Sequence, residues 1–369
     1  MRTLRMINKL VVENLKHRPL RTLLSIFAIS IQVTMVLTLV GLSAGMLDEQ
    51  ARRARGVGAD IIIRSPSSSV INTSLNMSAG IVSLVKSYPH IVAVTGVLAQ
   101  GTDLLNYTTG VDLEQFDKLN GGFRFLSGGP FQGPNDVLVD SYYATQHKYH
   151  VGDTINGIVN RSWRLAGIYE PGMLARLVVP LKTLQDITAN TGKVTIVYAK
   201  LDDPARTNEV IEELKQKLTG YQIRSMQEYT ELFSVNSVPM LKEFIYVVIA
   251  LGVLVGFLVV FLSMYTAVLE RTREIGVLKA LGASPAYVLN ILLRETTILA
   301  IAGSILGILF SYLTRYTIND VIHGSLIQAI VYIWWLIAAA IAIVGALLGA
   351  IYPGLKAARQ DAIEALAYD

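Results

Sequence analysis

Four long runs of apolar residues constrain the fold of this 369-residue chain more than any other feature. A helix needs about 20 consecutive apolar residues to cross the hydrocarbon core of a bilayer. The runs cover residues 22–42, 244–268, 289–313 and 330–352. Only the third carries charge, at Arg294 and Glu295 near its start. Charged residues make up 16% of the chain, against about 25% in an ordinary soluble domain. The sequence therefore predicts an α-helical membrane protein with four transmembrane helices.

The distribution of lysine and arginine predicts how the chain is oriented. Cytoplasmic loops of membrane proteins carry an excess of these residues. They gather before the first run (Arg2, Arg5, Lys9, Lys16, Arg18, Arg21), after the second (Arg271, Arg273, Lys279) and after the fourth (Lys356, Arg359). The loop between the third and fourth runs holds only Arg315. Both termini and residues 269–288 are therefore expected in the cytoplasm, with residues 43–243 outside.

The long segment between the first two runs has the pattern of an α+β domain. Strands are expected at 59–64, 91–98, 194–200 and 221–224, and helices at 77–87 and 205–218. Because strand–helix–strand occurs twice, we expect a split ferredoxin-like subdomain. A β-rich insertion at about 111–190 would separate its halves, with strands at 137–140, 151–155, 163–169 and 177–181. Residues 43–58 and 226–243 are expected to form two helical stalks.

Each apolar run contains or adjoins a pair of glycines four residues apart. The pairs are Gly41/Gly45, Gly252/Gly256, Gly303/Gly307 and Gly345/Gly349. Small residues at this spacing let helix backbones approach closely in a membrane, although glycine is also simply frequent in membrane helices. We interpret the pairs as helix-packing faces. No charge lies at the centre of a run, which argues against a proton relay or an ion pathway.

The chain offers little material for catalysis or metal binding. It has no cysteine, and His147 and His150 lie three residues apart without an apparent acidic partner, which favours a solvated helix end over a metal site. The loop at 126–130, Leu-Ser-Gly-Gly-Pro, resembles the signature loop of an ABC ATPase. However, no Gly-x-x-x-x-Gly-Lys-Ser/Thr phosphate loop occurs in the sequence. We expect no catalytic residue, no metal site and no bound cofactor.

The candidate functional residues lie in the segment 269–288. Ile275, Leu278 and Leu281 recur at helical spacing, so a short helix would present one apolar stripe. Gly282 suits the end of that helix, and the Ser-Pro that follows suits the start of the next. The candidate set is Glu270, Arg271, Arg273, Glu274, Ile275, Leu278, Lys279 and Leu281. Periodicity alone leaves two interpretations open: docking in a groove of a cytoplasmic partner, or lying on lipid headgroups.

Residues 270–285, Glu-Arg-Thr-Arg-Glu-Ile-Gly-Val-Leu-Lys-Ala-Leu-Gly-Ala-Ser-Pro, resemble the coupling segment of the MacB/FtsX-type ABC transporter permeases, the type VII or mechanotransmission group. The resemblance extends over nearly the whole chain. It includes an amphipathic entry helix within 1–21 (Leu4, Ile7, Val11), the segments 18–25, 110–113, 125–128, 137–140, 151–155 and 163–169, the third run with Glu295, Gly303 and Gly307, and the tail within 353–369. The tail has Ala362 where the family usually has proline.

The resemblance implies a permease that works with a separate ABC ATPase, since the fused ATPase of MacB is not found in this sequence. Two permease copies, identical or paralogous, would pair in the bacterial cytoplasmic (inner) membrane, and two ATPase copies carrying ATP and Mg²⁺ would dock on residues 270–284. ATP binding would move the external domains by mechanotransmission and drive export or extraction of an envelope substrate. A periplasmic adaptor or membrane-fusion protein is a further candidate partner, besides membrane lipid, and no nucleic acid is expected.

The motifs leave one alternative function open. In it, the same motion serves a transmembrane signal relay that activates an envelope hydrolase or senses an envelope ligand. A plain membrane-anchored binding protein is disfavoured by the coupling segment. The identity of the substrate is not encoded in any of these motifs.

Overall fold

The computed structural model describes residues 19–66, 76–101, 107–235, 237–238, 240–321 and 326–360. The chain divides into two compact units. The helical unit comprises Met1–Ser43, Met240–Thr317 and Gln328–Asp369, and the sheet unit comprises Ala44–Pro239 and Ile318–Ile327. Residues 1–18 of the expected entry helix and residues 361–369 of the tail lie outside the described residues.

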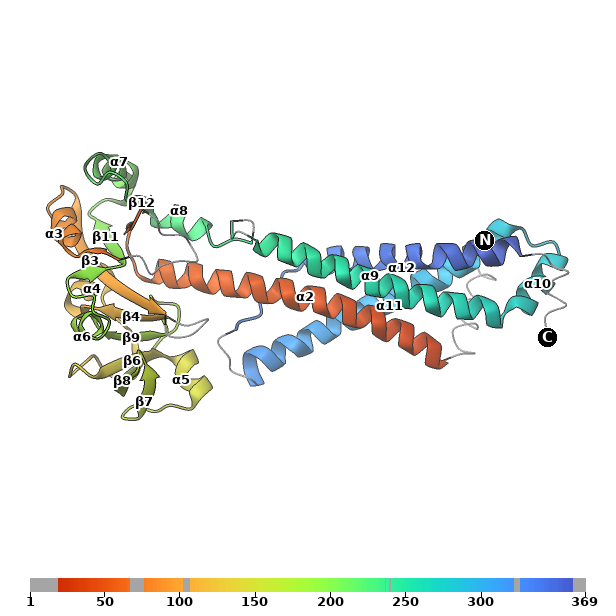
Figure 1. The fold of residues 1–369 in the computed structure, drawn as a ribbon, viewed down its shortest axis with the longest axis horizontal. Helices are drawn as coiled ribbons and strands as arrows, with labels where there is room; N and C mark the ends of the chain where they lie inside the picture. The colour runs from red at the N-terminus through yellow and green to blue at the C-terminus, as the bar shows by residue number, and fades with distance from the viewer. Residues whose placement is uncertain are drawn as a thin grey trace. The chain divides into compact units, whose positions relative to one another are not determined.

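Among the described residues, four helices are long and apolar enough to cross a bilayer. They are α2 (Pro19–Gly56), α9 (Leu241–Glu270), α11 (Pro285–Tyr316) and α12 (Ile333–Arg359), and Figure 1 shows α9 and α12 side by side. The four expected runs fall on these helices, which confirms that part of the predicted fold class. α11 begins as expected from its Ser-Pro, because Ser284 Oγ accepts the Tyr287 backbone N–H at 3.2 Å. A short π-helix, η2 (Thr317–Val321), follows α11.

Three of the four glycine pairs lie where helices of this one chain approach each other. Gly252 and Gly256 of α9 and Gly303 and Gly307 of α11 face α2, whereas Gly345 and Gly349 of α12 face α9. A Cβ at Gly307 would lie 2.7 Å from Val33 Cβ. The same close approach lets Thr34 Oγ1 donate to the Gly307 carbonyl at 3.0 Å. These glycines therefore serve contacts between spans, and in the membrane such contacts rest on packing and hydrogen bonds.

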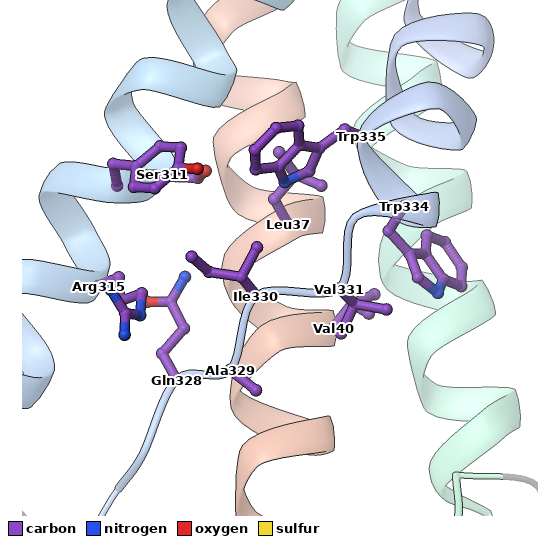
Figure 2. Close-up of a pocket in the computed structure, with 11 residues that line it drawn as sticks. Leu37, Val40, Ser311, Arg315, Gln328, Ala329, Ile330, Val331, Trp334 and Trp335 are labelled. Carbon is purple, nitrogen blue, oxygen red and sulfur yellow. The ribbon is translucent and has the colours of Figure 1, made fainter.

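An extended segment at 328–331 leads into α12 and packs against α2 (Figure 2). The Ala329 N–H donates to the Gly41 carbonyl at 2.9 Å. A Cβ at Gly41 would come within 2.6 Å of the Ala329 carbonyl, so this glycine faces extended backbone and not a helix. Gln328 lies beside Arg315, and the cavity that they help to line measures about 20 Å³. That is room for about one water molecule, so it does not suit a transported molecule.

The first and last parts of the sheet unit form a ferredoxin-like subdomain. Its strands are β1 (Ile61–Arg64), β3 (Ile91–Gly101), β11 (Ile196–Leu201) and β12 (Gln222–Ser225), and its helices are α3 (Gly80–Lys86) and α7 (Thr207–Lys217) with the 3₁₀ turn η1 (Pro204–Arg206). The strands pair antiparallel in the order β12-β1-β11-β3. This is the order that two strand–helix–strand units adopt when they interlock, and it confirms the predicted split subdomain. The helix expected over 77–87 begins only at Gly80, because Met77–Ser78 (β2) pairs with Lys193–Val194 (β10).

The insertion between β3 and β11 continues the same sheet. Its elements are β4 (Tyr107–Val111), α4 (Leu113–Asn120), β5 (Phe125–Gly128), β6 (Asp136–Asp140), α5 (Ser141–His147), β7 (Thr154–Ile158), β8 (Arg161–Tyr169), β9 (Leu177–Pro180) and α6 (Leu181–Ile187). β4 pairs with β3, and the order runs on through β9, β6, β8 and β5, with β7 on β8. The insertion thus starts at β4, earlier than the expected residue 111.

The two faces of the subdomain sheet have different covers. α3 and α7 pack on one face through Ile81, Val85 and Leu214, against strand residues such as Val197. The other face packs against α4, α8 (Met226–Glu231) and the α2 residues that belong to this unit. Figure 1 shows α3 and α7 beside β11 and β12.

One of the two expected stalks differs from the prediction. α2 continues as one helix to Gly56, as expected for residues 43–58. Residues 226–243, however, do not form one helix: α8 ends at Glu231 and α9 begins at Leu241. Val238 precedes a proline, which disfavours helical backbone at that position, and Met240 has a positive φ of 63°.

Candidate functional site

The segment with the candidate residues forms a short helix, α10 (Thr272–Ala280), between α9 and α11. Arg271 alone separates α9 from α10. Thr272 Oγ1 donates to the carbonyl oxygens of Val268 (3.1 Å) and Leu269 (2.9 Å), which occupies two acceptors at the end of α9. α10 ends at Ala280, and Gly282 takes a φ of 92° that few other residues adopt easily. The sequence therefore fixes both ends of α10.

The three members of the expected apolar stripe differ in environment. Ile275 is buried within the helical unit, Leu278 is half-buried, and Leu281 is 81% exposed. Leu281 is the C-cap residue of α10, and its backbone N–H still donates to the Val277 carbonyl at 3.0 Å. Val277, which the stripe omitted, is 45% exposed. The apolar surface that α10 offers to a partner is thus Val277 and Leu281.

A cluster of charged side chains holds the start of α10 against the neighbouring helices. Arg271 Nη1 lies 3.3 Å from Glu295 Oε2, and Arg21 Nη2 lies 3.5 Å from Glu295 Oε1. Arg21 Nη1 also lies 3.5 Å from Glu270 Oε2. Glu295 is only 1% exposed, and a carboxylate buried this deeply is tolerable when it is paired. The cluster joins α2, α9, Arg271 and α11.

Lys279 fixes the other end of α10. Its Nζ donates to the Ala358 carbonyl at 3.0 Å and to the Gln360 carbonyl, both at the end of α12. A cation at a helix C-terminus satisfies carbonyls that lack helical partners and interacts favourably with the helix dipole. Lys279 therefore has a positioning contact, whereas Arg273 and Glu274 are exposed.

Sequence reasoning placed Glu270 and Arg271 in the site but did not link them to Arg21 or Glu295. Arg21 and Glu295 are 274 positions apart, so no local pattern joins them. The available signal was the position of Glu295 itself, an acidic residue inside an otherwise apolar run, since such residues usually have a partner.

The described residues give no indication of catalytic chemistry in the site. Within that part of the chain, no group of three or more His, Asp or Glu side chains is placed to hold a metal ion. His147 and His150 are both exposed, and the His147 ring stacks on Tyr149 with centroids 5.5 Å apart. What the site offers is a small exposed surface on a helix that is fixed at both ends.

Two family descriptions match the chain. "MacB-like periplasmic core domain" matches residues 22–217, and "FtsX-like permease C-terminal" matches residues 246–362. Over 114 residues, the chain is 37% identical to the ABC transporter permease YtrF of Bacillus subtilis, covering 30% of this chain and 26% of YtrF. Over 393 residues, it is 24% identical to the macrolide export ATP-binding/permease protein MacB of Escherichia coli, covering 97% of this chain and 60% of MacB. The chain thus spans at most about 60% of the length of these relatives.

Two solved structures are also similar to this chain. The periplasmic region of MacB from Actinobacillus actinomycetemcomitans has a TM-score of 0.38 at 15% identity, covering 48% of this chain and 94% of that one. The extracellular domain of the transporter YknZ from Gram-positive bacteria has a TM-score of 0.35 at 12% identity, covering 45% of this chain and 99% of that one.

Proposed function

The chain belongs to the family of ABC transporter permeases that have a MacB-like periplasmic core domain and an FtsX-like C-terminal region, and we propose that it is a membrane subunit through which a separate ATPase drives export or extraction of an envelope substrate. The observation that carries this proposal is α10, a short helix between two spans with Val277 and Leu281 exposed. A groove on the ATPase would receive these two side chains, as grooves receive the apolar face of a helix elsewhere.

ATP and Mg²⁺ are assigned to the ATPase, because these 369 residues contain no phosphate-binding loop. Two permease copies, identical or paralogous, would pair in the cytoplasmic membrane and bind two ATPase copies, with an adaptor as a further partner. The substrate named for MacB of Escherichia coli is not assigned to this chain.

The orientation is part of the proposal, with both termini and α10 in the cytoplasm and the sheet unit outside. The excess of lysine and arginine beside α10 supports it. The chain has no cysteine, so single cysteines can test it. In intact cells, an impermeant maleimide should label Asn160→Cys and leave Ala286→Cys unlabelled until the cells are opened. Labelling of Ala286→Cys in intact cells would contradict the orientation.

The function is tested with the purified chain in lipid nanodiscs. The chain alone should not hydrolyse ATP above the level of empty nanodiscs. The ABC ATPase that co-purifies with it should hydrolyse ATP faster in its presence. Hydrolysis by the chain alone, or the absence of any ATPase from the co-purified material, would overturn the proposal.

A further inference from the structure

A cavity of about 340 Å³ lies within the sheet unit, against the sheet face that α3 and α7 leave uncovered. Typical small-molecule sites measure about 300–1,000 Å³. The floor of the cavity consists of alternate residues from three adjacent strands: Val97 and Ala99 of β3, Tyr107 and Thr109 of β4, and Ile196 and Tyr198 of β11. Alternate residues of a strand point to the same face, so the strands present one continuous surface.

The walls of this cavity are mainly apolar and carry almost no net charge. Ala54 of α2, Tyr229 of α8 and Phe233 in the turn after α8 also line it. Among the described residues, Arg53 is the only charged side chain in the lining. Arg53 Nε lies 3.1 Å from Glu49 Oε1, so this arginine is already paired with a carboxylate. The lining favours an uncharged ligand, because an ion would lose its hydration without gaining a counter-charge.

Two phenols in the lining form no hydrogen bond with another described residue. Tyr198 and Tyr229 are 5% and 6% exposed, and no described residue forms a hydrogen bond with either hydroxyl. Burial raises the pKa of both phenols, so both keep their protons and can donate. Buried polar groups usually have a hydrogen-bond partner. An acceptor oxygen in the cavity would supply one.

We propose that this cavity binds a small uncharged amphiphile whose apolar body packs on the strand floor and whose carbonyl or ether oxygen accepts a hydrogen bond from Tyr198 or Tyr229. The apolar floor supplies the larger part of the affinity, because burial of apolar surface is favourable in proportion to its area. The phenols supply orientation. Binding at this site needs no ATPase, so it can be measured whether or not the proposed transport function is correct.

The probe is benzophenone, an uncharged diaryl ketone that carries one acceptor oxygen and crosslinks to nearby C–H bonds under ultraviolet light. The full chain is placed in phosphatidylcholine nanodiscs, titrated with benzophenone and irradiated, and the labelled peptides are identified by mass spectrometry. Peptides that contain Ala54, Val97, Tyr198 or Phe233 should be labelled saturably. Benzophenone dissolved in lipid will label the spans in proportion to its concentration, which provides an internal reference.

Two kinds of variant separate specific binding from general hydrophobic contact. Ala99→Phe places a ring in the cavity and should reduce cavity labelling at least tenfold relative to labelling of the spans. The double variant Tyr198→Phe, Tyr229→Phe keeps the shape and removes both donors, and should weaken the saturation midpoint by about three- to tenfold.

Tyr88→Phe is the matched control. Tyr88 is another phenol of the sheet unit with an unpartnered hydroxyl, but it packs with the α3 and α7 face. This variant should leave labelling unchanged, and all variants should retain the unfolding temperature within a few degrees. Labelling confined to the spans, or cavity labelling that neither Ala99→Phe nor the double phenylalanine variant reduces, would overturn the proposal.

Discussion

Replacing Leu281 by aspartate tests docking on α10 with little risk to the fold. Leu281 is 81% exposed in the isolated chain and lies just past the end of α10, so its side chain contributes little to packing. If an ATPase groove buries it, the interaction supplies about 1.5–3 kcal/mol. Its loss corresponds to a decrease in affinity of roughly 10- to 150-fold. Val277→Asp should act in the same direction with a smaller effect, because Val277 is already about half-covered by the chain itself.

The assay is the affinity of the purified ATPase for nanodiscs that contain each permease variant. Leu126→Asp, at an exposed leucine of the sheet unit, is the matched control and should bind the ATPase normally. Leu278→Asp is not a clean test, because Leu278 is half-buried and the change would disturb α10 itself. If Leu281→Asp binds the ATPase as tightly as the unchanged chain, the docking surface is wrong. The lipid-headgroup interpretation of α10 would then be preferred.

Three further predictions follow from contacts inside each unit. Gly349→Ala should destabilise the chain by about 1–3 kcal/mol, because the added Cβ would lie 2.7 Å from a carbonyl oxygen of α9. Gly345→Ala should be nearly neutral, since the nearest atom to its added Cβ is 3.5 Å away. Equal unfolding temperatures for the two variants would contradict this prediction. Glu295→Gln should lower the free energy of unfolding by about 3 kcal/mol, because it removes the carboxylate that faces the buried Arg271. Glu270→Gln changes a side chain that is 43% exposed and should lower it much less in the same thermal unfolding assay. The hydrogen bond from Arg164 of β8 lowers the pKa of Asp136 below its ordinary value. The stabilisation that Asp136 provides is therefore complete above about pH 4 and is lost as pH falls through the folded-state pKa. The stability advantage over Asp136→Asn should shrink as pH falls below about 4, and an advantage that stays constant from about pH 4 to pH 2 would refute the assignment.

Much of the fold could be predicted because its elements have regular patterns. The spans are continuous apolar runs, and β6, β8 and β9 are short apolar segments bounded by turn residues. β4 was missed because Thr108 and Thr109, although buried, are polar and interrupt the apolar pattern. Their burial depends on neighbours from distant parts of the sequence, since β4 pairs with β3 on one side and β9 on the other.

The candidate site could be predicted only in part, for two physical reasons. Periodicity placed Ile275, Leu278 and Leu281 on one stripe, but the packing of the neighbouring helices decides how far each is covered, and it buries Ile275 while leaving Leu281 exposed. The pairing of Glu295 with Arg21 and Arg271 depends on how three segments pack, which no local spacing encodes. The same holds for the Lys279 contact with the end of α12.

The contacts that anchor α10 determine whether a force applied to it moves α10 alone or is transmitted to the neighbouring helices. Moving α10 alone would require separation of Arg271 from the buried Glu295 of α11, and breaking a buried ion pair costs about 3–5 kcal/mol. It would also require loss of the Lys279 hydrogen bonds to the end of α12, each worth about 1.5–3 kcal/mol because the donor is charged. Withdrawal of Ile275 from its buried position would add to these costs. When a partner displaces Val277 and Leu281, moving the attached helix ends together with α10 therefore costs less free energy than detaching α10 from them. That is the mechanical property a coupling helix needs, and a loop resting loosely on lipid headgroups would lack it.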